Sequence, residues 1–117
     1  KGTFDLKHHG IVPVIDLARV YALAGGDAAV NTHERLAHAA GSGEISAGSV
    51  RDLRDALEFL CSLRIRHQAQ QIAEGRAADN FLHPEELSQF ERSTLKDAFG
   101  VVKTLQDVLA QRYPANR

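Results

Sequence analysis

The sequence predicts an all-α protein, namely an up-and-down bundle of four main helices with short extra turns. Apolar residues recur at helical spacing in four segments, and glycine or proline stands near the end of most of them. No segment shows a convincing β-strand pattern, and the chain contains no repeat or low-complexity stretch. The 117 residues suit a single domain, so we expect residues 1–117 to fold as one helical unit.

The first helix is expected to begin near Pro13, because proline is tolerated in a first helical turn. Residues 1–10 are polar and bounded by glycine, which predicts a lead-in segment before that helix. Gly25 and Gly26 end this first helix, since glycine accepts the left-handed turn after a helix. Apolar side chains cover most of its circumference: Val14, Ile15, Leu17, Ala18, Val20, Tyr21 and Leu23. A helix of this kind is buried, either at the centre of the bundle or beneath a neighbour.

A short second helix is expected over residues 31–40, with Asn31 or Thr32 as its N-cap. Glu34 then lies in the first turn, where a negative charge is favoured by the helix dipole. Residues 41–49, GSGEISAGS, have the composition of a flexible linker.

The long third helix is expected to run from about Ser46 or Ser49 to Glu74, where Gly75 stops it. At 100° per residue, one stripe is apolar and is made of Val50, Leu53, Leu57 and Cys61, flanked by Leu60 and Ile72. The opposite face is charged or polar and consists of Arg51, Asp55, Glu58, Ser62 and Arg66. The helix is therefore amphipathic over its first half.

The fourth helix follows a turn over residues 79–84, DNFLHP, in which aspartate and asparagine can accept their own backbone N–H groups. Ser88 and Glu91 form a capping-box pattern at its start, and Pro114 lies beyond its expected end at about Arg112. Its apolar face comprises Leu95, Ala98, Phe99, Val102, Leu109 and Tyr113.

The inward stripe of the third helix turns polar near its C-terminus, where Arg64 and Gln68 continue the apolar face and Gln71 flanks them. A buried guanidinium without partners costs several kcal/mol, so something must meet Arg64. Three explanations are open: the helix end extends into water, a polar network with Asp16, Asp79 or Asn80 satisfies the arginine, or a pocket there takes an anionic ligand. Arginine suits the last role because its planar group can bind phosphate through two hydrogen bonds.

The composition excludes several function classes. Lys and Arg total 14 against 15 for Asp and Glu, so overall attraction to nucleic acid is not expected. No apolar run approaches the ~20 residues that cross a bilayer, and no signal peptide is evident, so no membrane contact is expected. The single Cys61 fits a reducing cytoplasm. The chain lacks methionine and begins at Lys1, which suggests a piece of a longer protein.

The sequence contains no recognisable catalytic or metal-binding pattern. His8 and His9 are adjacent, and His33 and His38 are five apart, so neither pair has the i, i+4 spacing of two metal ligands on a helix. Cys61 lies on the apolar stripe, where cysteine behaves as a small hydrophobe. No Walker motif and no Asp-x-Asp, Asp-x-Glu or Glu-x-Glu pair occurs. We therefore expect neither a metal site nor a catalyst in this chain alone.

Six stretches resemble a known bacterial family, in the expected order: FDLKHHG, IDLARVYAL, NTHERL, FLCSLRIRHQ, DNFLHPEELSQFER and LKDAFGVVKTLQ. The family is the nucleotidyltransferase substrate-binding domain. It ends multidomain signal-transduction proteins that carry a nucleotidyltransferase-like domain, commonly behind cyclic-nucleotide-binding and CBS domains. The resemblance spans nearly the whole chain and implies that residues 1–117 are the C-terminal fragment of such a protein.

The resemblance also implies a role. The helical bundle would pack behind the upstream nucleotidyltransferase domain and help to form a cleft for nucleotide or acceptor. Magnesium and a nucleoside triphosphate would belong to the longer protein, and no cofactor to this fragment. The residues that match the family's motifs are Lys7, Arg19, Thr32, Arg35, Arg64, His67, Gln68 and Asn80. Local explanations compete, since Thr32 can cap a helix, Asn80 can form a turn and Arg19 can pair with Asp16.

Two functional hypotheses follow. In the first, the chain is an accessory substrate-binding domain in which Arg64 and Gln68, with Arg19 or Lys7, contact the ligand. In the second, it is a non-catalytic interaction module that docks neighbouring domains or a second copy of itself as a homodimer. The extensive apolar surface of the first helix motivates the second hypothesis.

Overall fold

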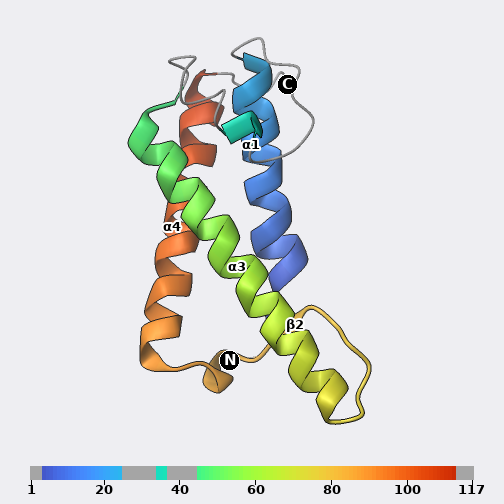
Figure 1. Ribbon diagram of the computed structural model, residues 1–117. Coiled ribbons are helices and arrows are strands. Elements are labelled where there is room, and N and C mark those ends of the chain that lie inside the picture. Colours follow the sequence, from blue (N-terminus) through green and yellow to red (C-terminus); the bar gives the residue numbers. More distant parts are fainter. Residues whose placement is uncertain (1–3, 25–33, 37–44, 113–117) are drawn as a thin grey trace.

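The computed structural model describes residues 4–24, 34–36 and 45–112 of the chain. Its elements are β1 (Phe4–Asp5), the π-helical turn η1 (Lys7–Ile11), α1 (Val12–Ala24), α3 (Ala47–Ala73), β2 (Phe81–Leu82), the 3₁₀ turn η2 (Pro84–Glu86) and α4 (Gln89–Arg112). Residues 34–36 are helical as well. The long helices alternate in direction, as Figure 1 shows, with α3 running against both α1 and α4. The predicted all-α, up-and-down class is therefore confirmed.

A minimal sheet corrects the prediction that the chain has no strand. β1 and β2 pair antiparallel, with Phe4 opposite Leu82 and Asp5 opposite Phe81. Just beyond the pair, the Leu6 N–H donates to the Asn80 carbonyl at 2.8 Å. Strands of two residues are too short to show an alternating pattern, which is why the sequence did not reveal them. They fix the start of the chain against the loop that follows α3.

The first helical run also begins earlier than predicted. Residues 7–11 form η1, which continues directly into α1, so the lead-in segment is largely helical. Gly10 explains how η1 approaches α3 so closely, because a Cβ atom at this position would lie 3.1 Å from both methyl groups of Leu60. The small residue therefore determines the spacing between the two elements.

The helix ends agree with the local signals. The Ser46 side chain accepts a hydrogen bond from the Ser49 N–H, so α3 begins at the earlier of the two predicted positions and the predicted linker is shorter than residues 41–49. Gly75 has a φ of 78° immediately after the C-cap of α3. Ser88 and Glu91 form the reciprocal capping box, with N–H to side-chain distances of 3.0 and 3.1 Å. The predicted positions at 25–33, 37–44 and 113 lie outside the described residues.

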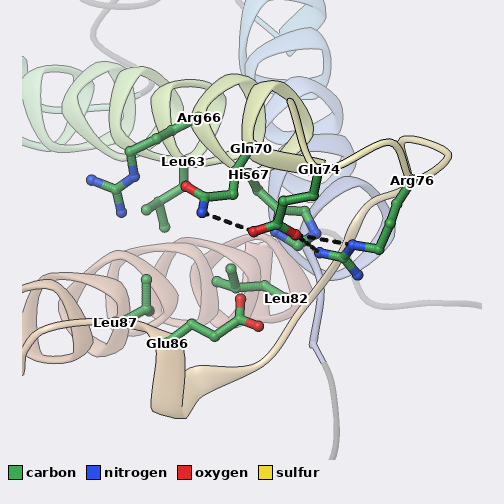
Figure 2. A pocket seen from close by; sticks show the side chains of 9 residues that line it. All are labelled: Leu63, Arg66, His67, Gln70, Glu74, Arg76, Leu82, Glu86 and Leu87. Carbon is green, nitrogen blue, oxygen red and sulfur yellow. Dashed lines mark hydrogen bonds and ion pairs between the residues drawn. The ribbon is translucent and has the colours of Figure 1, made fainter. Parts of the chain in front are cut away.

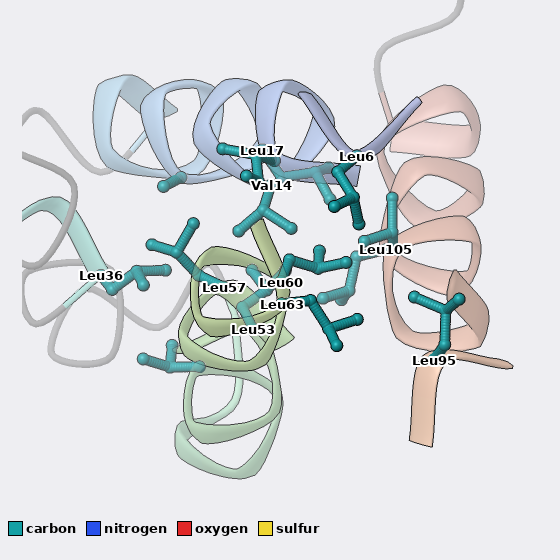
Figure 3. Packing of buried hydrophobic residues seen from close by; sticks show 14 of the residues in the cluster. Leu6, Val14, Leu17, Leu36, Leu53, Leu57, Leu60, Leu63, Leu95 and Leu105 are labelled. Atoms are coloured by element: carbon teal, nitrogen blue, oxygen red, sulfur yellow. The ribbon is translucent and has the colours of Figure 1, made fainter. Parts of the chain in front are cut away.

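The three long helices bury one hydrophobic core (Figure 3). Its fully enclosed side chains are Leu6, Val14, Tyr21, Leu36, Leu53 and Leu60. The Tyr21 hydroxyl donates to the Leu105 carbonyl at 3.1 Å and links α1 to α4. Two predictions of burial were wrong: Ile72 is 65% exposed, and Val20 is 41% exposed because α1 packs on one side only. Among the described helices, none carries an apolar stretch that could span a lipid bilayer.

Candidate functional site

The polar end of α3 is held by the loop that follows it. Gln71 is 3% exposed, and its amide nitrogen donates to the Asp79 carboxylate at 3.0 Å. The Asp79 N–H donates back to the Gln71 side-chain oxygen at 2.9 Å. This reciprocal pair satisfies both ends of a buried amide, which would otherwise destabilise the fold. Gln71 therefore has a structural role.

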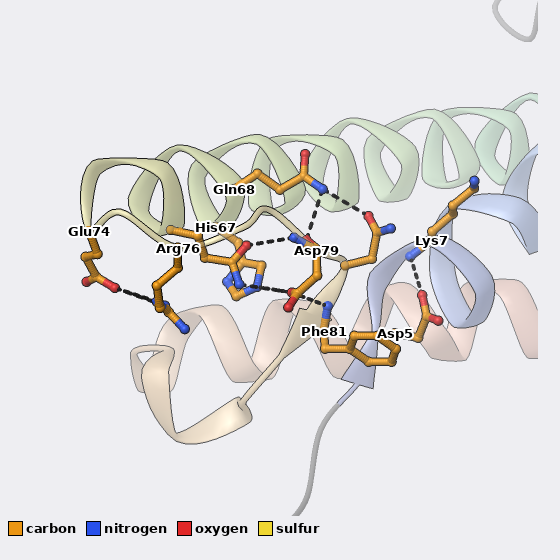
Figure 4. Close-up of polar contacts among 10 residues, drawn as sticks. Asp5, Lys7, His67, Gln68, Glu74, Arg76, Asp79 and Phe81 are labelled. Carbon is orange, nitrogen blue, oxygen red and sulfur yellow. Dashed lines mark hydrogen bonds and ion pairs between the residues drawn. The ribbon is translucent and has the colours of Figure 1, made fainter.

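The Asp79 carboxylate has two further partners beside this pair (Figure 4). Its carboxylate accepts from the Phe81 N–H at 3.0 Å and contacts the His67 ring nitrogen Nε2 at 3.2 Å. Hydrogen bonding, first from Gln71 and then from the Phe81 backbone, lowers the pKa of Asp79 below its ordinary value. The His67 side chain is 7% exposed, so this network fixes its ring in place.

Gln68 joins the network through the neighbouring residue. Its amide nitrogen donates to the Asp79 carbonyl at 2.9 Å and to the Asn80 side-chain oxygen at 3.3 Å. The Asn80 carbonyl in turn accepts from Leu6, as described above. A polar network thus joins Gln68, His67 and Asn80, three of the residues that the family motifs single out.

Arg64 lies beside this network without being part of it. It is half-buried, and its Nε–H group is buried without an acceptor. It lies one turn from Leu60, which touches the Gly10 position, and one turn from Gln68, which contacts Asn80. The side chain therefore faces η1. No described residue forms a hydrogen bond or ion pair with its guanidinium, so Arg64 does not form the polar network with Asp16, Asp79 or Asn80 that was one of the three open explanations.

Lys7 lies on η1, immediately after the Leu6 that bonds to Asn80. Figure 4 shows its side chain extending toward α3. Lys7 is exposed, and its backbone N–H donates to the Asp5 carboxylate, but its ammonium group pairs with no described residue. We call Lys7, Arg64, Gln68 and Asn80 the cationic edge.

The other predicted residues are placed differently. Arg19 lies two turns into α1 and is exposed, with its guanidinium 3.1 Å from the Asp16 carboxylate, as the local explanation predicted. Arg35 is half-buried in the helical residues 34–36, and it has an interaction partner within the chain. Thr32 lies outside the described residues. The structure therefore joins Gln68, His67 and Asn80 in one network, with Arg64 one helical turn from Gln68 and Lys7 next to Leu6, and it does not place Arg19 with them.

A pocket of about 310 Å³ opens on another face of α3, against β2 and η2 (Figure 2). Its lining residues are Leu63, Arg66, His67, Gln70, Glu74, Arg76, Leu82, Glu86 and Leu87. Of these, only His67 was a candidate site residue predicted from the sequence, and Arg66 was predicted to lie on the solvated face. The available signal was the spacing of Leu63, Arg66, Gln70 and Glu74, which share one helical face.

The charges of this pocket are largely matched internally. Arg76 pairs with Glu74 at 2.9 Å, and Arg66 pairs with Glu91. Hydrogen bonds from Gln70 and then from Arg76 lower the pKa of Glu74, which keeps that carboxylate charged beside the opening. A phosphate would meet paired arginines and nearby carboxylates here. The cationic edge is therefore the better candidate for an anionic ligand.

The described residues contain no cluster of three or more histidine, cysteine or acidic side chains suited to hold a metal ion. Cys61 is half-buried beside the core, and burial raises the pKa of its thiol. A raised pKa disfavours the reactive thiolate.

The described residues thus form a small all-α bundle with a partly cationic edge and a pocket of about 310 Å³. The chain belongs to the family described as "Putative nucleotidyltransferase substrate binding domain", whose model matches residues 1–113. The family resemblance seen in the sequence is thereby confirmed. Comparisons with curated proteins and with solved structures found no match.

Proposed function

We propose that this chain is the accessory substrate-binding domain of a nucleotidyltransferase of the signal-transduction type. It would pack against an upstream nucleotidyltransferase-like domain of the same protein and close one side of the cleft for nucleotide or acceptor. Family membership supports the general role. The cationic edge supports the choice of surface, because neither Lys7 nor Arg64 forms a side-chain hydrogen bond or ion pair with a described residue.

The observation that carries this proposal is the buried Nε–H group of Arg64, which has no acceptor. A buried donor without a partner costs about 1–3 kcal/mol, so the fold keeps this arginine at a cost to its own stability. The terminal amino groups of the guanidinium also form no hydrogen bond with a described residue, so they are available to a ligand. A phosphate group fits the need because a guanidinium can bind it through two parallel hydrogen bonds. Magnesium and a nucleoside triphosphate would be supplied by the catalytic domain.

Gln68 and Asn80 have a supporting role in this proposal. Their side chains are hydrogen-bonded to each other, and Gln68 also donates to the Asp79 carbonyl. These contacts hold the loop after α3 against the helix next to Arg64. The same loop is tied to Leu6, so it also positions Lys7. The edge is thus fixed before a ligand arrives, which reduces the entropy cost of binding.

The test uses the intact protein that contains this domain, titrated with the magnesium complexes of nucleoside triphosphates. Arg64→Ala and Lys7→Ala should each weaken binding by about tenfold, since a hydrogen bond to a charged group contributes about 1.5–3 kcal/mol. Arg51→Ala is the matched control, because Arg51 is exposed on the solvated face of α3. Unchanged affinity in both edge variants, with normal binding by the intact protein, would disprove this site.

A second candidate function is self-association, as in the alternative hypothesis. Ile65 and Ile72 are seven residues apart on α3 and are 69% and 65% exposed, so they share one outward face. We take these two exposed isoleucines as the centre of the contact surface that a second copy would cover. Sedimentation velocity tests the idea: the chain should dimerise, and Ile72→Glu should return it to a monomer. A wild-type chain that stays monomeric at high concentration would exclude it.

A further inference from the structure

A second surface of the bundle has the features of a docking groove. It lies between the N-terminal half of α3 and the middle of α4, where two hollows of about 160 and 570 Å³ adjoin. Both hollows are lined by Asp52, Asp97 and Val101, so they form one continuous groove. This acidic groove involves no residue of the cationic edge.

The floor of the acidic groove is apolar and made partly of small residues. Ala56 and Ala98 are buried at its base, while Phe59 and Val101 are only partly covered. Gly100 lines the wider hollow, and a Cβ atom added there would meet nothing within 4 Å. Small residues let a partner backbone come close, and the aromatic ring of Phe59 offers apolar area for it to cover.

The rim of the groove carries carboxylates from both helices. Asp52 and Asp55 lie on α3, and Asp97 lies on α4. All three are exposed, and none forms a hydrogen bond or ion pair with any residue that the structure describes. Lys96 is the cation lining the wider hollow, so the rim as a whole remains negative. Phosphate-bearing ligands are therefore repelled, and a positively charged partner is favoured.

We propose that the acidic groove binds a basic amphipathic helix of a partner protein. An apolar ridge of that helix would lie on the floor, with lysine or arginine side chains reaching the rim carboxylates on both sides. The groove follows α3 from Ser49 to Phe59, which corresponds to about 15 Å, or roughly three turns of a bound helix. The charge pattern selects the partner, and the apolar floor supplies the contact area.

The experiment titrates the 117-residue chain with a designed helical peptide of about 14 residues, apolar on one face and lysine-rich along both flanks. A peptide with glutamate in place of each lysine is the probe control. The lysine peptide should bind, and its affinity should fall between about 0.05 and 0.3 M salt, because salt screens exposed charges. NMR shift changes should concentrate on the α3 and α4 residues that line the groove.

Two variants of the chain locate the site. Replacing Asp52, Asp55 and Asp97 by asparagine should weaken binding by about tenfold. The matched control replaces three exposed carboxylates outside the groove, Glu58, Glu85 and Asp107, by their amides and should bind normally. Gly100→Arg should also block binding, because a long cationic side chain enters the groove from a position where the fold has open space.

Several outcomes would overturn the proposal. Binding of both peptides alike, equal weakening by the control variant, or shift changes centred on η1 would each place the interaction elsewhere. Failure of the lysine peptide to bind would reject a basic helix as the occupant. Self-association of the wild-type chain that the groove asparagine variant abolishes would show that a second copy occupies the groove instead.

Discussion

Gln71 and Asp79 exchange two hydrogen bonds across the turn that follows α3. The Gln71 amide nitrogen donates to the Asp79 carboxylate, and the Asp79 N–H donates to the Gln71 side-chain oxygen. Gln71 is buried, whereas the Asp79 side chain is about half exposed. The pair therefore attaches a surface loop to the core, and that loop carries Asn80 and β2. The geometry of the cationic edge depends on this attachment.

Replacing Gln71 by alanine should lower the free energy of unfolding by about 2 kcal/mol, because two hydrogen bonds and a filled buried position are lost together. Gln70→Ala is the matched control, since Gln70 is exposed on the same helix and bonds only to Glu74. Its expected loss is no more than about 0.5 kcal/mol. Urea denaturation of both variants measures the difference, and similar losses would contradict a special role for Gln71.

The stability of the domain should fall in acid partly through Asp79. Its pKa in the folded chain lies below the ordinary value of 3.8, chiefly because of the Gln71 hydrogen bond. The unfolded chain therefore binds more protons in this range. The stabilisation is present above the unfolded pKa and is lost as the pH falls through the folded one. Unfolding in urea from pH 6 down to about pH 3 measures this slope.

Asp79→Asn should make that acid slope shallower, because the variant has no carboxyl group to protonate there. Asp97→Asn is a suitable comparison, since the exposed Asp97 carboxylate forms no hydrogen bond or ion pair with any described residue. A slope for Asp79→Asn as steep as that of the wild type would show that the hydrogen bonds seen at Asp79 do not hold it ionised in solution.

Two helical glycines should respond in opposite directions to alanine. Gly100→Ala should stabilise the chain by up to about 1 kcal/mol, because alanine favours helix and the added methyl group meets open space. At Gly10 the same methyl group would lie 3.1 Å from Leu60, which is fully buried and cannot move aside freely. Gly10→Ala should therefore destabilise by about 1 kcal/mol. Equal effects in urea denaturation would contradict the close packing of η1 on α3.

The accuracy of the sequence predictions depended on how local each signal was. Ser46, Gly75 and the capping pair Ser88 and Glu91 act within one turn of helix, and the structure places helix ends at each of them. The strand pair and η1 could not be predicted in this way. Their formation depends on contacts such as the one between Leu6 and Asn80, which lie far apart in the chain.

The candidate site was predicted in part for the same reason. Helical spacing showed that Arg64 and Gln68 face inward, but it could not show that Gln68 finds its partners in the loop while Arg64 finds none. The pocket was missed because Arg66 and Glu74 come to face β2 and η2, and Arg66 meets Glu91 of α4, only through the packing of α3 against the rest of the chain. The residue spacing within a single helix does not reveal how that helix packs against its neighbours.

Arg64→Met tests whether the arginine stabilises this chain or reduces its stability for the sake of binding. Methionine keeps most of the apolar stem beside Leu60 and removes the buried donor that has no acceptor. The free energy of unfolding of the 117-residue chain should therefore stay constant or rise by about 1 kcal/mol. Arg66→Met is the control, because Arg66 pairs with Glu91, and it should lose up to about 1 kcal/mol. A loss above about 2 kcal/mol for Arg64→Met would instead show that Arg64 stabilises the fold.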